Sequence, residues 1–194
     1  ATANTAQAFD EKDLAKLNQT KKCVKCDLRG AKLTKANLSG ANLSGANLTE
    51  AILRSANLLY ANLSGADLQD AKLSEAKLTK ADLSGAKLIN ANLDKAKLEG
   101  ASLSKADLRW ADLGRARLNR ADLSKADLTT ANLYKADLTK ANLSGAMLRY
   151  AKLAKTNLSD TKLEGVDLYR ANLTGANLSK AKLSNISVKY TNLT

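Results

Sequence analysis

Two cysteines three residues apart are the side chains best suited to covalent or metal chemistry in this sequence. They stand in Cys23-Val24-Lys25-Cys26, and such a pair serves as a redox dithiol, as half of a metal site or as a structural disulfide. The redox motif belongs at the start of a helix after a strand, which is not the context here. No histidine occurs in the chain, so two cysteines alone cannot complete a zinc site.

Aspartates recur at twenty-residue steps or multiples of them, and stacked carboxylates suggest a calcium site or a general acid and base. The series comprises Asp67, Asp107, Asp127 and Asp167. Lys87 and Met147 interrupt it, and the G-G-x-G-x-D repeat of calcium-binding solenoids is missing. We therefore expect the aspartate or asparagine at this position to hydrogen-bond its own backbone in a solvated turn.

Positive charge is the third chemical feature, because 31 lysines and arginines against 19 acidic residues give a net charge of +12. When outward positions are stacked at twenty residues, one face collects cations suited to nucleic acid, an anionic membrane surface or an acidic protein. This candidate binding face contains Lys95, Lys97, Arg115, Arg117, Arg120 and Lys135. The alternative is a solvated exterior, which any soluble repeat protein needs.

Bulky pairs recur on what the stacking assigns to a further face, separate from the aspartates. The candidate aromatic edge contains Arg109, Trp110, Arg149 and Tyr150. Tryptophan, tyrosine and arginine dominate the hot spots of protein interfaces, so this edge is a candidate recognition surface. No nucleophile stands beside a base and no phosphate-binding motif occurs. We therefore expect a protein that is not an enzyme and holds no cofactor.

These side chains are positioned by a five-residue repeat. Leucine occupies every fifth position from Leu28 to Leu193, with Val188 as the one substitute among 34 sites, and alanine stands two places earlier in 28 of 33 sites. A helix would scatter these residues around its axis, and a flat strand would send successive leucines to opposite faces. The backbone must turn a corner in every unit, so leucine and alanine point into a solenoid.

A slower rhythm indicates four sides to each coil. Serine follows the leucine at positions twenty residues apart, from Ser44 to Ser144, which fits four units of five residues, although segment duplication leaves the same trace. Nine of the ten glycines stand two places after the leucine, where a corner could demand a positive φ. Gly114 is the exception.

The repeat closely resembles the pentapeptide-repeat family, whose unit is commonly written A-(D/N)-L-x-x, as at residues 36–40 and 121–123. The resemblance implies an all-β solenoid, a right-handed quadrilateral β-helix, and the 34 units would make about eight coils. Some family members protect DNA gyrase by imitating duplex DNA. That mimicry needs a negative rod, so a charge of +12 makes it a minor hypothesis here.

A helical cap is expected before the repeat. Asp10 is suited to cap a helix from about Glu11 to Asn18, and Phe9 and Leu14 have the spacing of a hydrophobic staple. The cap would cover the open leucine end of the first coil. The expected organisation is a flexible segment at 1–8, the cap with its cysteine staple at 9–27 and the β-helix at 28–194.

The phase of the repeat favours a disulfide between Cys23 and Cys26. Cys23 falls at a leucine position and Cys26 at an alanine position, so both would point inward; buried thiols, redox chemistry and metal binding remain alternatives. Residues 13–30 are similar to the opening of cyanobacterial and plastid lumenal family members, which supports the disulfide. Together with Ala6-Gln7-Ala8, which has the small-x-small form of an export cleavage site, this favours the periplasm or thylakoid lumen over the cytoplasm.

The expected role is a structural or protein-interaction scaffold with an unknown protein partner. A basic rod that binds a polyanion is the alternative. No helix is predicted to cover the last coil, so an end-to-end homodimer through the C-terminal coil is a further hypothesis.

Overall fold

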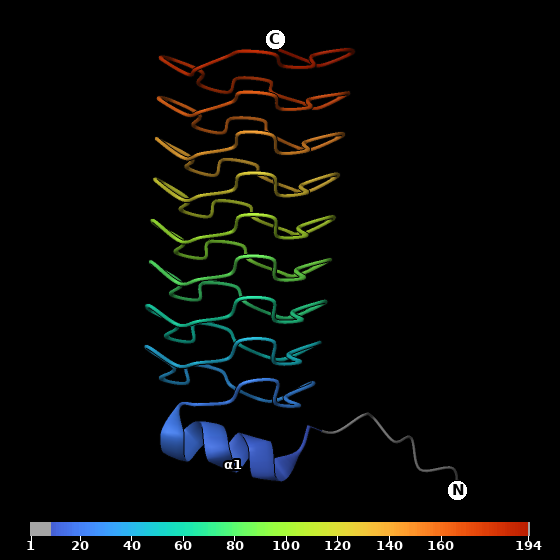
Figure 1. The fold of residues 1–194 in the computed structure, drawn as a ribbon. Coiled ribbons are helices and arrows are strands. Elements are labelled where there is room, and N and C mark those ends of the chain that lie inside the picture. The colour runs from blue at the N-terminus through green and yellow to red at the C-terminus, as the bar shows by residue number, and fades with distance from the viewer. Residues whose placement is uncertain (1–8, 194) are drawn as a thin grey trace, which may run out of the picture.

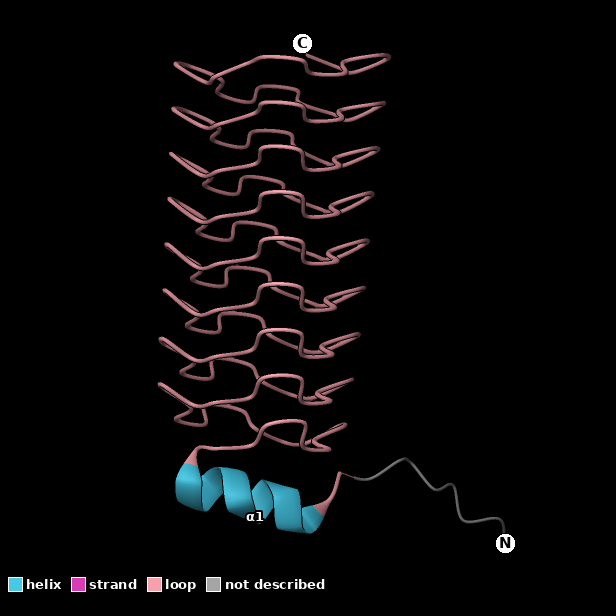
Figure 2. Cartoon of the chain, viewed as in Figure 1, coloured by secondary structure: helices cyan, strands magenta, loops and turns pink. Residues whose placement is uncertain are grey.

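The described residues form one column of stacked coils, and a helix lies across the N-terminal end of the column (Figure 1). The structure is a computed structural model that describes residues 9–193, so the segment expected to be flexible, 1–8, lies outside the described residues. Helix α1 spans Glu11–Thr20. Within the described part, everything after α1 is turns and short extended links (Figure 2). No helix there is long and apolar enough to cross a membrane.

Each coil contains twenty residues. Parallel bridges join residues twenty apart, from the pair Lys22 and Asn42 to the pair Asn172 and Asn192. Every described bridge is isolated, so the expected β structure consists of one-residue bridges and not of extended strands. We number the four sides of the coil by their first leucines, and each side recurs at every twentieth residue. Side 1 begins with Leu28, side 2 with Leu33, side 3 with Leu38 and side 4 with Leu43.

Main-chain hydrogen bonds hold one coil on the next, as the unit around Leu63 illustrates. The N–H of Leu63 donates to the carbonyl of Asp82 at 2.7 Å, and the N–H of Gly65 donates to that of Ser84 at 2.9 Å. The N–H of Ala66 donates back to the carbonyl of Leu63 at 3.0 Å and closes the corner. Because these bonds recur along the column, most polar groups of the backbone are satisfied without water.

The side chain before the leucine accepts the N–H of the residue after it. The N–H of Ser64 donates to Asn62 Oδ1 at 3.0 Å, and that of Ser84 donates to Asp82 Oδ1 at 2.9 Å. The aspartates of the stacked series accept in the same way, at Asp67, Asp107, Asp127 and Asp167. The prediction that these aspartates serve hydrogen-bonded turns is confirmed.

Leucine and alanine fill the interior. Every leucine of the repeat from Leu28 to Leu173 is at most 4% exposed, and burial of each side chain contributes about 2 kcal/mol. The last coil differs, because Leu183, Val188 and Leu193 are 51%, 45% and 59% exposed. No coil in the described part of the chain covers them.

The corner residue, two places after the leucine, has a positive φ between 52° and 69° in every unit from Lys25 to Tyr190. Glycine is therefore placed as predicted, yet most corners carry other residues that accept the cost of a left-handed conformation. Gly114 serves another purpose. A Cβ there would lie 3.1 Å from a carboxylate oxygen of both Asp94 and Asp112, so a side chain at this position would require these carboxylates to shift.

Helix α1 begins at the predicted cap. Asp10 Oδ1 accepts the N–H of Lys12 at 2.8 Å. The helix ends two residues beyond the expected Asn18, because the left-handed Lys21 donates its N–H to the carbonyl of Leu17 at 2.9 Å. Leu17 is buried, and Phe9 and Leu14 pack against the core. Helix α1 thus shields the leucines of the first coil.

Candidate functional site

The two cysteines form a disulfide beneath α1. Cys23 and Cys26 are bonded, with their Cα atoms 5.2 Å apart, and both are buried. The Asp13 carboxylate lies within 4.8 Å of both sulfurs, but disulfide sulfurs are not thiolates and do not offer metal ligation. Asp13 Oδ2 instead accepts the N–H of Asp27 at 2.8 Å. These contacts fasten the helix to the first coil, in agreement with the structural interpretation of the pair.

The cations of the candidate binding face come together on side 3 and the corner that precedes it. Lys95, Arg115 and Lys135 occupy that corner in three successive coils. Lys97 and Arg117 are bridge partners on side 3 itself. Arg120 occupies the next corner, at the far edge of side 3.

Half of this face is already engaged. Arg115 lies 3.1 Å from Asp94, and Arg117 lies 2.8 Å from Glu99. Lys135 lies over the ring of Tyr134, 5.2 Å from its centroid. The other three members, Lys95, Lys97 and Arg120, have no acidic partner among the described residues. Binding by this face therefore depends mainly on these three side chains and stays a prediction.

The sequence did not reveal a hollow on side 3. It is lined by Arg117, Asn119, Arg120, Asp137, Thr139 and Lys140. Stacking the sequence at twenty residues places these positions in neighbouring coils. The depth of the hollow depends on the lengths of the side chains in both coils, and the repeat pattern does not predict this depth.

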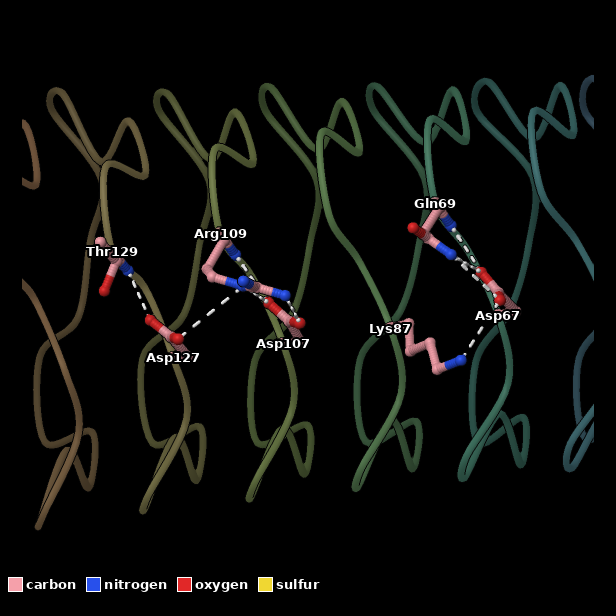
Figure 3. Close-up of polar contacts among 7 residues, drawn as sticks. All are labelled: Asp67, Gln69, Lys87, Asp107, Arg109, Asp127 and Thr129. Atoms are coloured by element: carbon pink, nitrogen blue, oxygen red, sulfur yellow. Dashed lines mark hydrogen bonds and ion pairs between the residues drawn. The ribbon is translucent and has the colours of Figure 1, made fainter.

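The aspartates and the bulky pairs lie on the same side of the coil, which corrects their assignment to separate faces. Arg109 donates to both oxygens of Asp107, at 2.8 and 2.6 Å, and its Nε lies 3.8 Å from Asp127 (Figure 3). In the same row, Lys87 lies 3.7 Å from Asp67 (Figure 3). The physical reason is that residues before and after one leucine belong to one side of the coil. Side 1 therefore balances much of its own charge.

These contacts shift the protonation of the aspartates. The hydrogen bond from the Arg109 guanidinium holds the pKa of Asp107 below its ordinary value, against a smaller opposing effect of burial. Burial acts to raise the pKa of Asp167, but the N–H of Tyr169 and the Arg149 guanidinium together lower it. Both carboxylates are thus held as anions that neutralise the arginines of side 1.

The candidate aromatic edge divides into two parts. Trp110 is 53% exposed, and the guanidinium carbon of Arg109 lies 5.7 Å from the centroid of its ring. Tyr150 belongs to a separate stack of rings two coils further along the column. Tyr150 meets Tyr169 edge to face with ring centroids 5.6 Å apart, and Tyr169 meets Tyr190 at 5.7 Å.

We call Tyr150, Tyr169, Arg170 and Tyr190 the aromatic strip. Arg170 lies 5.5 Å from the Tyr169 ring and 5.6 Å from the Tyr190 ring. The sequence placed these residues on one face as bulky pairs, but stacking did not show which rings touch, because they meet at steps of 19 and 21 residues rather than twenty. The sequence feature that could have predicted these ring contacts is the presence of long side chains at adjacent positions of adjacent coils.

The disulfide predicts a measurable loss of stability when it is removed. Replacing both cysteines, Cys23→Ala with Cys26→Ala, should lower the free energy of unfolding by about 2 kcal/mol, because the unfolded chain loses one small closed loop. Urea unfolding of the oxidised protein measures the difference. A phosphine reductant should destabilise the wild type and leave the variant unchanged. Equal stability of the two oxidised proteins would contradict the structural role.

The lowered pKa of Asp107 predicts a pH-dependent effect of Arg109→Gln. A carboxylate with a depressed pKa stabilises the fold above its unfolded pKa of about 3.9, and this contribution disappears as the pH falls through the folded value. The variant should therefore melt below the wild type near neutral pH, and the gap should narrow below pH of about 4. Arg120→Gln, which removes an arginine without an ion pair, is the control and should show no such pH dependence. A gap that stays constant from neutral to acidic pH would contradict the assignment.

Comparison with known proteins identifies the repeat. A family model described as pentapeptide repeats matches in 8 copies, which cover residues 26–70, 66–104, 106–145, 126–165 and 151–187. No curated protein matches the chain.

Solved structures of the same kind are similar to the chain. HetL, a pentapeptide repeat protein involved in heterocyst differentiation regulation from the cyanobacterium Nostoc sp. strain PCC 7120, is 36% identical, with 84% of this chain and 87% of that chain covered and a TM-score of 0.50. A trypsin-treated form of QnrB1, a plasmid-mediated fluoroquinolone resistance protein, is 19% identical, with 85% and 87% covered and a TM-score of 0.74. A pentapeptide repeat protein from the Arabidopsis thaliana thylakoid lumen is 37% identical, with 52% and 66% covered and a TM-score of 0.27.

The family match and the likeness to HetL and QnrB1 together imply the right-handed quadrilateral β-helix that the sequence predicted. The chain belongs to the pentapeptide repeat family.

Proposed function

We propose that the protein is a non-enzymatic scaffold that binds a protein partner through the aromatic strip on side 1. The observation that carries the proposal is the strip itself: stacked rings and an arginine on a rigid coil. Tyr150 is 46% exposed and Tyr190 is 65% exposed, and Met147 beside them is 42% exposed. Tyrosine, arginine and methionine are enriched in protein interfaces.

The contacts within the strip favour binding at a low entropic cost. Edge-to-face packing and cation–π contacts restrict the rings before a partner arrives, so less side-chain freedom is lost on association. Arg149, next to the strip, is paired with Asp167 at 2.5 Å, whereas Arg170 and Lys189 lie against the tyrosine rings of the strip. A surface of stacked rings with cations held against them favours a protein that offers apolar groups together with a few hydrogen-bond acceptors.

The C-terminal coil adds a second copy of the chain to the possible partners. Leu183, Val188 and Leu193 are exposed there, and Tyr190 of the strip belongs to the same coil. An end-to-end homodimer stays a prediction. Gyrase mimicry gains no support, because the likeness to QnrB1 concerns the fold and the chain carries a net charge of +12.

We also propose an exported compartment, the periplasm or the thylakoid lumen. The support is the closed and buried disulfide, since disulfides persist in oxidising compartments and are rare in the cytosol.

The strip predicts a selective loss of a protein partner from Tyr150→Ala with Tyr190→Ala. Each truncated hot-spot ring costs about 2 kcal/mol or more, so recovery of the partner should fall by at least about tenfold. Affinity capture from an extract of the source organism at high salt, quantified by mass spectrometry, measures it. Light scattering of the purified protein tests the second-copy alternative.

The matched control is Tyr60→Ala with Tyr134→Ala. These tyrosines are exposed and each lies beside a lysine, but neither is stacked on another ring in the described structure. The control should recover the same proteins as the wild type. Identical recovery by all three proteins would contradict the proposed role of the strip.

Polyanion binding is the second candidate function, and the three unpaired cations of the candidate binding face favour it. It predicts affinity for duplex DNA, single-stranded RNA or anionic vesicles that falls by orders of magnitude between about 0.05 and 0.2 M salt. Changing Lys95, Lys97, Arg115 and Arg120 to glutamine should abolish this affinity, because it removes all three cations of the face that lack an acidic partner among the described residues. The control changes four side 4 lysines to glutamine: Lys105, Lys125, Lys162 and Lys182. No binding by the wild type at moderate salt would exclude the candidate.

A further inference from the structure

We infer that side 3 carries a discrete site for an acidic peptide segment of a partner protein, centred on the hollow between two coils. The site is separate from the aromatic strip, which lies on the opposite side of the coil. The hollow is lined by Arg117, Asn119, Arg120, Asp137, Thr139 and Lys140.

The register of the coils builds the hollow. Arg117 and Asp137 are bridge partners at one edge of side 3. At the other edge, the N–H of Arg120 donates to the carbonyl of Thr139 at 2.9 Å, which places Lys140 one coil beyond Arg120 at the same corner. Neighbouring coils are about 4.8 Å apart. The hollow is thus a fixed depression between two cationic corners and a row of shorter polar side chains.

Charge within the hollow is unbalanced. The Nε of Arg117 is directed to Glu99 at 2.8 Å. Asp137 is the one carboxylate in the lining, where it accepts the N–H of Thr139 at 3.0 Å and the hydroxyl of the same residue. Its negative charge offsets one of the three cations that line the hollow, Arg117, Arg120 and Lys140. Arg120 and Lys140 have no acidic partner within the described chain. Like charges one coil apart repel each other, and an anion between them removes that repulsion.

Asn119 adds a second, independent observation. Its Oδ1 is buried and has no hydrogen-bond partner, and a buried unpaired acceptor is costly. Asn119 lines the hollow, and a rotation of its amide toward a bound ligand would break no hydrogen bond of this oxygen. A ligand that places an N–H beside its negative charge satisfies the oxygen and the cations together. A peptide with aspartate or glutamate side chains has both groups.

The acidic residues around the hollow argue against a densely charged ligand. Glu99 borders it in the preceding coil, at the position that Asn119 occupies in its own coil, and Asp160 follows at the corner after Lys140. These carboxylates confine the uncompensated positive charge to two coils. Duplex DNA carries a phosphate charge about every 1.7 Å of its axis and would meet both carboxylates, whereas a peptide with a few spaced carboxylates avoids them.

Fluorescence anisotropy with a labelled decapeptide of aspartate, glutamate, glycine and serine tests the site. Arg120→Gln with Lys140→Gln should weaken binding of this peptide by about tenfold, because it removes two charge-assisted contacts. The matched control is Lys105→Gln with Lys125→Gln. These lysines are also stacked one coil apart at corners with φ of 58°, but on side 4 and away from the hollow. The control removes the same net charge and should change affinity by less than about twofold.

The variant Asn119→Ala distinguishes binding at a specific site from nonspecific electrostatic attraction to the basic rod. It should weaken peptide binding by about threefold without changing how affinity depends on salt, since no charge is removed. Thermal melting of each variant confirms that the coil is folded. Equal loss of affinity in the hollow variant and its control would overturn the proposal. Absence of peptide binding, or tighter binding of single-stranded RNA of equal charge, would overturn it as well.

Discussion

The register of each coil on the next is the constraint on which every other feature depends. The N–H of each core leucine donates to a carbonyl of the following coil, as Leu63 does to Asp82 at 2.7 Å. A slip of one residue would carry leucine out of the interior and polar residues into it. The buried leucines and alanines therefore select one register, and that register alone determines which exterior side chains become neighbours.

This register leaves little freedom to the residue before each leucine. Asparagine or aspartate there accepts an N–H of its own turn, as Asn62 does at 3.0 Å. Where lysine, arginine or methionine takes the position, that bond is given up and a longer side chain faces outward. Arg117 in the hollow and Met147 beside the strip are examples, but Lys152 and Lys162 make the same exchange away from both surfaces. Replacement of asparagine or aspartate at this position therefore does not by itself indicate a binding surface.

The sequence predicts the parts of the structure that repeat. It misses the contacts that long side chains make with different positions of neighbouring coils. The leucine period is sufficient for the coil, and Asp10 marks the start of α1 because capping is local. The neighbourhood of Arg109 is different, since its guanidinium reaches Asp107 in its own unit and approaches Asp127 in the next coil. Tyr169 likewise meets rings at 19 and 21 residues' separation. Stacking at twenty residues compares identical positions only, so contacts between different positions escape it.

A closed coil of this kind also separates its surfaces energetically. The aromatic strip on side 1 and the hollow on side 3 are on opposite sides of one hydrogen-bonded core, with buried leucines such as Leu138 and Leu148 between them. Coupling between two sites requires an element with two arrangements whose balance both ligands change. Each of these coils is held on both sides by hydrogen bonds and offers one arrangement. Two partners would therefore bind independently, and any gain in joint affinity would come from a link between the partners themselves.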